Sequence, residues 1–202
     1  MAITIRKIPC PVGATLMKTG QTTSYRTGDD GDIEAGRDVD FFTLASNNPF
    51  GNTNRFTDEL GGTAYANDIV IDWSTYNGST VLGYCRRLVS SGGVFDFTWD
   101  NAVDVAAAFT KGTFTSGWRL WNRNECNNIV NAETPGGFNY APFDNPAGEL
   151  VGQNIWTSST LKIGTTSAWF TQFYGRVDYS QKTNLKRVIA VRTFTVTGTT
   201  LT

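Results

Sequence analysis

One segment in the middle of the chain has the three- and four-residue apolar spacing of an amphipathic helix. It runs from Trp99 to Phe109 and follows Thr98, a residue type that is favoured at helix starts. Its apolar face consists of Trp99, Ala102, Val103, Ala106 and Phe109. The pattern therefore predicts a helix that buries this face against a core.

A second, shorter helix is predicted from Arg123 to Asn131. Asn122 is in the position of its cap, and Glu125 is the third helical residue, as a capping box requires. Ile129 and Val130 then fall on the side that should face inward.

Short β-branched and aromatic runs predict strands on both sides of these helices. Residues 69–71 and 81–84 flank Asn77-Gly78, a dipeptide typical of tight hairpins. Further runs follow the helices at residues 155–158, 168–173 and 188–194, and a threonine-rich tail covers 195–202. Strands and helices do not alternate, so we expect an α+β fold in which two helices are segregated from an antiparallel sheet.

The first forty residues differ from the rest of the chain. Ile3 and Ile5 alternate with polar residues as in a short strand, and two prolines then interrupt the pattern. An acidic cluster follows, formed by Asp29, Asp30, Asp32 and Glu34. Its spacing does not match a calcium-binding EF-hand loop, so a solvated turn is favoured. We predict that residues 1–40 are an irregular attachment arm that orders against a partner chain, and that residues 41–202 are the main domain.

Charge and composition limit the chemistry that the protein can perform. The 202 residues include 17 basic and 18 acidic side chains, and a net charge of −1 offers no basic field to nucleic acid or an anionic membrane. The chain has no histidine, which excludes histidine-based nucleophilic catalysis and histidine-ligated metals. No apolar run has the length of a membrane span, and the first residues do not form a signal peptide. We expect no nucleic-acid partner, no membrane insertion and no cofactor.

The cysteines do not indicate a disulfide framework. There are three, Cys10, Cys85 and Cys126, and no pair has the CxxC spacing of many zinc sites. Buried or free thiols are the favoured interpretation. A bridge between Cys85 and Cys126 remains open for a protein that meets an oxidising environment.

A series of short motifs runs through the second half of the chain. They are Gly117-Trp118-Arg119-Leu120, Arg123-Asn124-Glu125, Ile155-Trp156-Thr157-Ser158-Ser159-Thr160, Ala168-Trp169-Phe170 and Val188-Ile189-Ala190-Val191-Arg192. In order and spacing, the series resembles the Lcl C-terminal-domain family of C-type-lectin-like domains, most strongly over residues 97–194. The resemblance implies a C-type-lectin-like fold, related to that of the variable proteins of diversity-generating retroelements.

The motif residues are mostly interpreted as structural. Trp118, Trp156 and Trp169 are expected to anchor the core, and Arg119 and Arg192 to pair with Glu125 or an aspartate. The chain departs from the family pattern at Trp121-Asn122 and at Cys126, where the family has proline with a small polar residue and leucine. The disulfides and calcium–sugar motifs of calcium-dependent lectins are missing from the sequence as well.

Three classes of function are compatible with the resemblance. The first is a non-enzymatic binding or display protein: a phage virion surface component, such as a decoration, fibre or receptor-binding protein, that presents the domain to a host surface, a glycan or a partner protein. The second is a purely structural virion subunit. The third is an enzyme like the formylglycine-generating branch of the fold, whose cysteines and metal ligands have no counterpart here. We favour the first, located in the virion, with a bacterial surface or secreted location as the alternative.

The resemblance places a ligand face on the late loops and the adjoining strand edges. The candidate residues there are Tyr140, Asn154, Tyr174, Arg176, Asp178 and Tyr179. Tyrosine offers rigid amphipathic area, asparagine both donates and accepts hydrogen bonds, and arginine forms paired ones. We expect binding without catalysis and without a metal. We also expect contacts to other virion or surface proteins through the arm. Whether the chain forms a homo-oligomer is left open.

Overall fold

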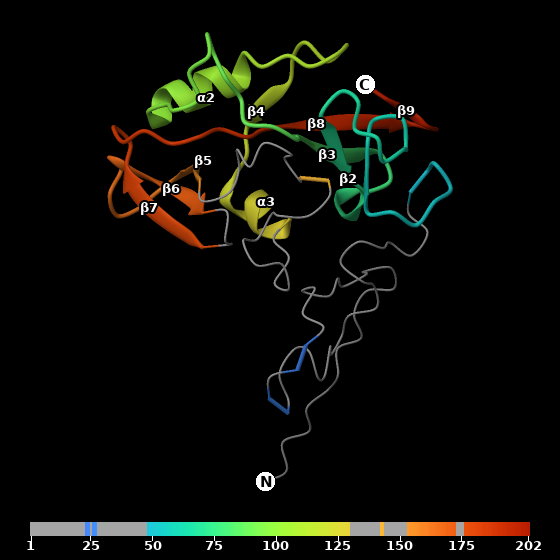
Figure 1. Cartoon of the computed structure of the whole chain (residues 1–202), viewed down its shortest axis with the longest axis horizontal. Helices are drawn as coiled ribbons and strands as arrows, with labels where there is room; N and C mark the ends of the chain where they lie inside the picture. Colours follow the sequence, from blue (N-terminus) through green and yellow to red (C-terminus); the bar gives the residue numbers. More distant parts are fainter. Residues whose placement is uncertain (1–22, 25, 28–47, 130–141, 144–152, 173–175) are drawn as a thin grey trace.

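The computed structural model describes residues 23–24, 26–27, 48–129, 142–143, 153–172 and 176–202. These residues form an α+β domain with two short α-helices and two antiparallel sheets (Figure 1). In chain order the elements are β1 (Phe56–Thr57), β2 (Ile69–Asp72), the 3-10 turn η1 (Trp73–Thr75), β3 (Thr80–Cys85), α2 (Trp99–Ala107), β4 (Trp118–Leu120), α3 (Arg123–Asn128), β5 (Asn154–Thr160), β6 (Ser167–Gln172), β7 (Val177–Gln181), β8 (Ala190–Thr197) and β9 (Thr200–Leu201). The strand expected at Ile3–Ile5, the acidic cluster and the boundary at residue 40 lie outside the described residues.

The larger sheet has the strand order β1-β2-β3-β8-β4, and β9 pairs with the end of β8. Strand β8 is central because it pairs with β3 on one edge and with β4 on the other. Gly83 of β3 lies opposite Arg192 and leaves room for the Phe194 ring, since a Cβ at this position would lie 2.4 Å from a ring carbon. The threonine-rich tail forms the end of β8 and β9, which close the sheet as a small hairpin.

The predicted hairpin is confirmed, with a longer connection than a two-residue turn. Strands β2 and β3 pair antiparallel, and η1 intervenes before Asn77-Gly78. Gly78 has a φ of 96°, which glycine adopts without strain. The Asn77 side-chain oxygen accepts hydrogen bonds from the backbone N–H groups of Ser79 and Thr80. This side chain therefore shapes the turn that leads into β3.

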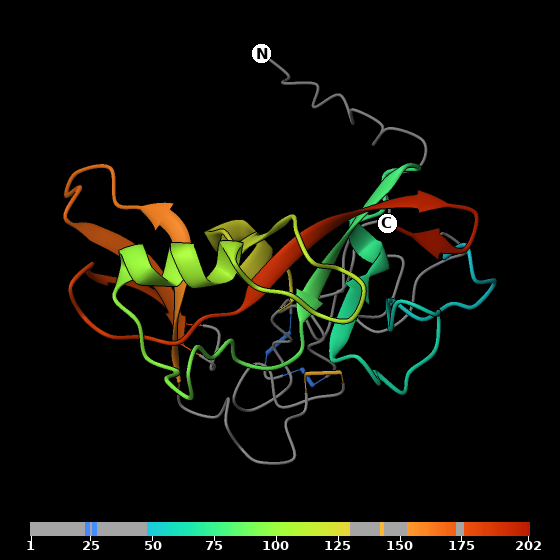
Figure 2. The same cartoon turned by 90° about the horizontal axis from the view of Figure 1, so that it is seen from above.

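The smaller sheet has the order β5-β6-β7 and lies at one end of the molecule, while β1, β2, β3 and β9 lie at the other (Figures 1 and 2). All three late strand predictions are confirmed, with bounds shifted by one to three residues. The two sheets meet where Ile155 forms a parallel bridge with Arg187, just before β8. The backbone N–H of Trp156 donates to the Arg187 carbonyl at 3.0 Å. This bond connects the small sheet to the segment that leads into β8, the central strand of the large sheet.

Both predicted helices are present, and each ends earlier than expected. Helix α2 buries Ala102 and Ala106, but the Thr98 side chain makes no capping hydrogen bond. Helix α3 begins with the predicted capping box: the Asn122 side chain accepts from the N–H of Glu125, and the Glu125 carboxylate accepts from the N–H of Asn122. Ile129 is buried as expected, and Val130 lies outside the described residues.

Tryptophan side chains connect the helices to the small sheet. Trp118 and Trp156 are buried, as predicted. The prediction that Trp169 anchors the core is wrong. On β6 this side chain points to the face of the sheet opposite Phe170, where it is only half-buried. Its place in the core is taken by Trp121, whose indole N–H donates to the Trp156 carbonyl at 2.8 Å. The Trp156 indole in turn donates to the carbonyl of Phe97, just before α2, at 2.9 Å.

Only one of the two motif arginines has the expected acidic partner. Arg119 forms the predicted bidentate pair with Glu125, at 2.6 and 2.8 Å. Arg192 forms no ion pair with any described acidic residue, so that prediction is wrong. Its guanidinium lies 5.0 Å from the ring centre of Phe114 and 4.7 Å from that of Phe194. Aromatic faces replace the carboxylate as its electrostatic partner.

A fully buried ion pair ties the large sheet to helix α3. Arg55 donates to both oxygens of Asp72 at 2.9 Å, and neither side chain is exposed. Arg55 also donates to the carbonyl of Asn128, the last residue of α3, at 2.7 Å. The Asn128 amide donates back to Asp72 at 3.1 Å. The pair therefore links β2 to the end of the helix that covers the small sheet.

Candidate functional site

The structure places four of the six predicted ligand-binding residues on the small sheet. Asn154 begins β5, Arg176 directly precedes β7, and Asp178 and Tyr179 lie on β7. The other two, Tyr140 and Tyr174, lie outside the described residues. The four described candidates therefore share one sheet, and their arrangement follows from its strand register.

Strand alternation divides these residues between the two faces of the sheet. Asp178 pairs with Phe170, and Tyr179 pairs with Trp169, so the two neighbours point to opposite faces. Arg176 is on the same face as Asp178, and the two form an exposed ion pair at 2.8 Å. Arg176 and Tyr179 were predicted from the sequence to belong to one site. The alternation of side chains along the strand places them on opposite faces of the sheet.

The face that carries Tyr179 has a row of three side chains in contact. The Tyr179 and Trp169 rings meet edge to face, with centroids 5.9 Å apart and an interplanar angle of 80°. On Trp169 lies the Arg123 guanidinium, 4.2 Å from the ring centroid. Tyr179 is 55% exposed and Trp169 is half-buried, so both rings present surface to solvent. We call these three residues the aromatic row.

Helix α3 holds the arginine end of the aromatic row in place. Arg123 is the first residue of the helix, and its backbone N–H donates to the Ser159 hydroxyl of β5 at 3.3 Å. The capping box and the pair between Arg119 and Glu125 fix the same turn. From the sequence, Arg123 was predicted only to be the first residue of a helix. Its contact with Trp169 joins residues 46 positions apart, and a contact of this range leaves no local pattern in the sequence.

The opposite face of the sheet holds a buried lysine. Lys186 is 8% exposed, and its ammonium lies 3.9 Å from the Phe170 centroid and 5.0 Å from that of Trp156. Burial lowers the pKa of Lys186, while the nearby charge of Asp178 acts in the other direction. The two rings stabilise the buried charge by cation–π contact. We assign this lysine a packing role beneath the sheet.

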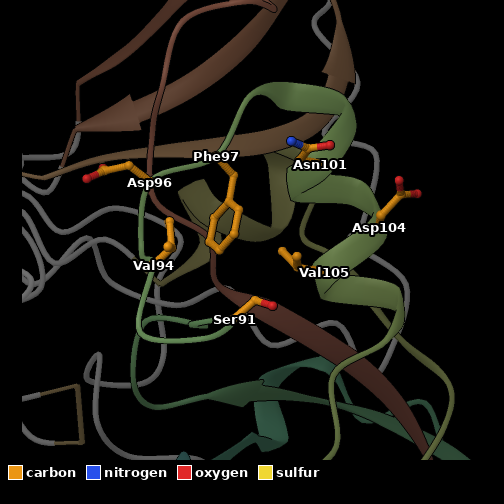
Figure 3. Close-up of a pocket in the computed structure, with 7 residues that line it drawn as sticks. All are labelled: Ser91, Val94, Asp96, Phe97, Asn101, Asp104 and Val105. Carbon is orange, nitrogen blue, oxygen red and sulfur yellow. The ribbon is translucent and has the colours of Figure 1, made fainter.

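A hollow of about 360 Å³ lies between α2 and the segment that precedes it (Figure 3). Its walls are Ser91, Val94, Asp96, Phe97, Asn101, Asp104 and Val105. Phe97 and Val105 face the hollow, whereas the carboxylates of Asp96 and Asp104 point outward on opposite sides. Asp96 is also paired with Arg187 at 3.0 Å. The two acids therefore do not converge as an acid–base pair would.

The described part of the chain offers neither a group of metal-ligating side chains nor a helix that could span a membrane. No three Cys, Asp or Glu side chains there are grouped as a metal would need. Neither described α-helix has the length and apolar character to cross a bilayer.

The two described cysteines are free thiols. Cys85 and Cys126 are both buried and do not form the bridge that the sequence left open. Burial raises the pKa of each thiol to about 12. The thiolate is the reactive form, so both side chains should be inert in the folded protein.

This inertness can be measured with a Cys10→Ser chain, in which only these two thiols remain. We expect a thiol reagent such as DTNB at pH 8 to label neither cysteine while the protein is folded, and both in denaturant, where the pKa returns to about 8.5. Rapid labelling of the native chain would contradict the burial of these thiols.

Comparison with known proteins agrees with the resemblance seen in the motifs. The family model described as Lcl C-terminal domain matches residues 65–192, a span from the start of the β2 hairpin region to β8. No curated protein matches the chain. The aromatic row lies entirely within the matched span.

Proposed function

The chain belongs to the Lcl C-terminal domain family, and from that membership we propose that it is a non-enzymatic binding protein with a C-type-lectin-like domain. In this proposal it is a surface component of a phage virion, and the domain is displayed to a glycan of the host surface. The motif series and the segregation of α2 and α3 from the antiparallel sheets support the lectin-like fold.

The aromatic row is the observation on which the binding proposal rests. Aromatic rings that keep part of their surface exposed provide flat apolar area, which can stack on the apolar face of a sugar ring. Arg123 lies over the Trp169 ring, where it adds N–H donors next to the exposed Tyr179 ring, and its position at the start of α3 limits how far it can move. Apolar area with adjacent donors suits the alternating C–H and O–H groups of a carbohydrate.

The rigid support of the row also favours binding. Thr157 of β5 donates from its hydroxyl to the Trp169 carbonyl at 2.9 Å, and α3 covers the neighbouring part of the same face. A site held by a strand and a helix loses little conformational entropy when a ligand binds. The row is therefore a better candidate than the hollow beside α2, whose acidic groups point apart.

We expect truncation of the row to weaken binding to host cells or to their isolated surface glycans. Tyr179→Ala and Trp169→Ala should each raise the dissociation constant at least about 30-fold, the equivalent of about 2 kcal/mol for an anchor residue. Binding would be measured by adsorption to host cells and by titration with purified surface glycan. The matched control is Leu60→Ala, which removes a 78% exposed apolar side chain between β1 and β2, at the other end of the domain.

The same assay tests the expected independence from calcium. Binding of the wild-type chain should be unchanged in EDTA, because the proposed contacts use rings and a guanidinium. Equal binding by the wild type and both ring variants would refute the site, and absence of binding by the wild type would favour a purely structural virion subunit. Mass spectrometry of purified particles against cell lysate tests the virion location separately.

A further inference from the structure

Strand β7 has an outer edge that no described strand covers. It is the last strand of the β5-β6-β7 sheet. The N–H of Gln172 donates to the Arg176 carbonyl, and the N–H of Lys182 donates to the Thr166 carbonyl. In an antiparallel ladder this places the outward N–H and C=O groups on the alternate residues, Val177 and Tyr179 among them.

The described residues give this edge only part of the protection that edge strands usually have. Natural sheets guard such strands with proline, charged side chains (lysine above all), bulges or very short length. β7 spans five residues, Val177–Gln181, and contains neither proline nor lysine. One outward backbone group is protected, because the Asp178 carboxylate accepts a hydrogen bond from the outward N–H of Tyr179 at 2.8 Å. The backbone groups of Val177 have no partner among the described residues.

The two faces of the edge have different chemistry. One presents Tyr179, exposed beside Trp169, and the other presents the carboxylate of Asp178. A strand that pairs with β7 would extend the sheet, and its side chains would lie alternately beside Tyr179 on one face and beside Asp178 on the other. Its side chains should therefore be apolar at one set of alternate positions and include a basic residue at the other.

We propose that residues 3–8 of a second copy of this chain pair with β7 as an added strand. This segment, Ile3-Thr4-Ile5-Arg6-Lys7-Ile8, has β-branched residues at four of its six positions and ends at a proline. With Ile3 and Ile5 on the side of Tyr179, Lys7 falls on that side as well and Arg6 on the side of Asp178. Asp178 already pairs with Arg176 at 2.8 Å, so Arg6 would share this carboxylate, and no acidic residue occurs before Asp29 to repel it.

The position of β7 indicates a second copy as the source of the strand. The described chain continues from residue 48 into β1 and β2, and β2 and β7 lie at opposite ends of the molecule (Figures 1 and 2). Residues 9–47 could extend over about 130 Å at 3.3 Å per residue. The connection is thus long enough to reach a neighbouring molecule, whereas pairing within one chain would require it to run the length of its own domain.

The test uses the full chain and measures its oligomeric state by light scattering over a range of concentrations. Val177→Pro deletes an outward N–H of the edge, and Ile5→Pro deletes an N–H of the arm. Each should weaken self-association at least about tenfold. The controls Val177→Ala and Ile5→Val keep these donors and should associate almost as the wild type does. A mixture of the two proline variants should form a 1:1 complex, because one retains the edge and the other retains the arm.

A labelled peptide of residues 1–12 gives a second measurement that does not depend on a substitution in the sheet. It should bind the Ile5→Pro chain, and excess unlabelled peptide should dissociate wild-type assemblies. Failure of the peptide to bind or to compete would overturn the pairing. A wild-type chain that stays monomeric while the peptide binds the Ile5→Pro chain would mean that the arm fills its own edge, which overturns the second-copy assignment. Glycan binding is tested separately by the ring variants, since every variant here leaves Trp169 and Tyr179 in place.

Discussion

Asp72→Ala is expected to lower the free energy of unfolding by about 3–5 kcal/mol, because it removes the buried carboxylate that accepts two hydrogen bonds from the buried Arg55 guanidinium. Both side chains of this pair are fully buried, and the nitrogen–oxygen distance is 2.9 Å. The substitution also removes the acceptor for the Ser74 N–H at the start of η1 and for the Asn128 amide. The change would be measured by denaturant unfolding, with the slope m checked for two-state behaviour.

The control for this pair is Asp178→Ala, which breaks the ion pair with Arg176 at 2.8 Å on the surface. Exposed pairs typically contribute about 0–1 kcal/mol, so this variant should unfold almost as the wild type does. Replacement of both Arg55 and Asp72 by apolar residues should recover part of the loss, because both buried charged groups are then removed together. Similar losses for Asp72→Ala and Asp178→Ala would contradict the buried position of the first pair.

Trp156→Ala is the second substitution with a large expected effect. The side chain is fully buried, its ring meets Phe170 edge to face at 6.3 Å, and its N–H donates to the Phe97 carbonyl. Removal of a buried tryptophan leaves a cavity and one fewer hydrogen bond to the Phe97 carbonyl, which also accepts from the Lys186 backbone N–H at 3.0 Å. We expect a loss of about 3–5 kcal/mol in the free energy of unfolding.

Trp169→Ala is the matched comparison, because the two residues occupy neighbouring strands of one sheet. Trp169 is half-buried, so we expect a loss of about 1–2 kcal/mol from this substitution. Unfolding in urea would distinguish the two variants. A larger loss at Trp169 than at Trp156 would show that the faces of the small sheet are assigned the wrong way round.

The sequence predicted best those elements whose signals are local. The cap of α3 needs only Asn122 and Glu125, three positions apart, and the structure has that box. The β2–β3 hairpin was indicated by Asn77-Gly78 between two apolar runs, and those runs pair as expected. Helix ends were less predictable, because fraying and the last turn depend on tertiary packing.

Long-range packing explains what the sequence did not indicate. Trp169 and Trp156 look equivalent as large apolar residues in late strands, and only the register of β5 and β6 places them on different faces. Arg192 was expected to find a carboxylate, and the fold brings two phenylalanine rings to it instead. In the candidate site, the types of residue could be predicted from the sequence. The separation of Arg176 from Tyr179 onto opposite faces could not, because it depends on where β7 begins and how it pairs with β6.

The indole hydrogen bonds have a consequence for how this sequence can evolve. Trp99, Trp121 and Trp156 donate to the main-chain carbonyls of Thr157, Trp156 and Phe97. A carbonyl acceptor is supplied by any amino acid, so the framework does not require a particular side chain on the accepting side of these bonds. Surface positions beside them can therefore accumulate substitutions while the three donors hold the helices to the sheet. Randomised libraries that keep these tryptophans and vary exposed positions of β7 should retain a high fraction of folded members.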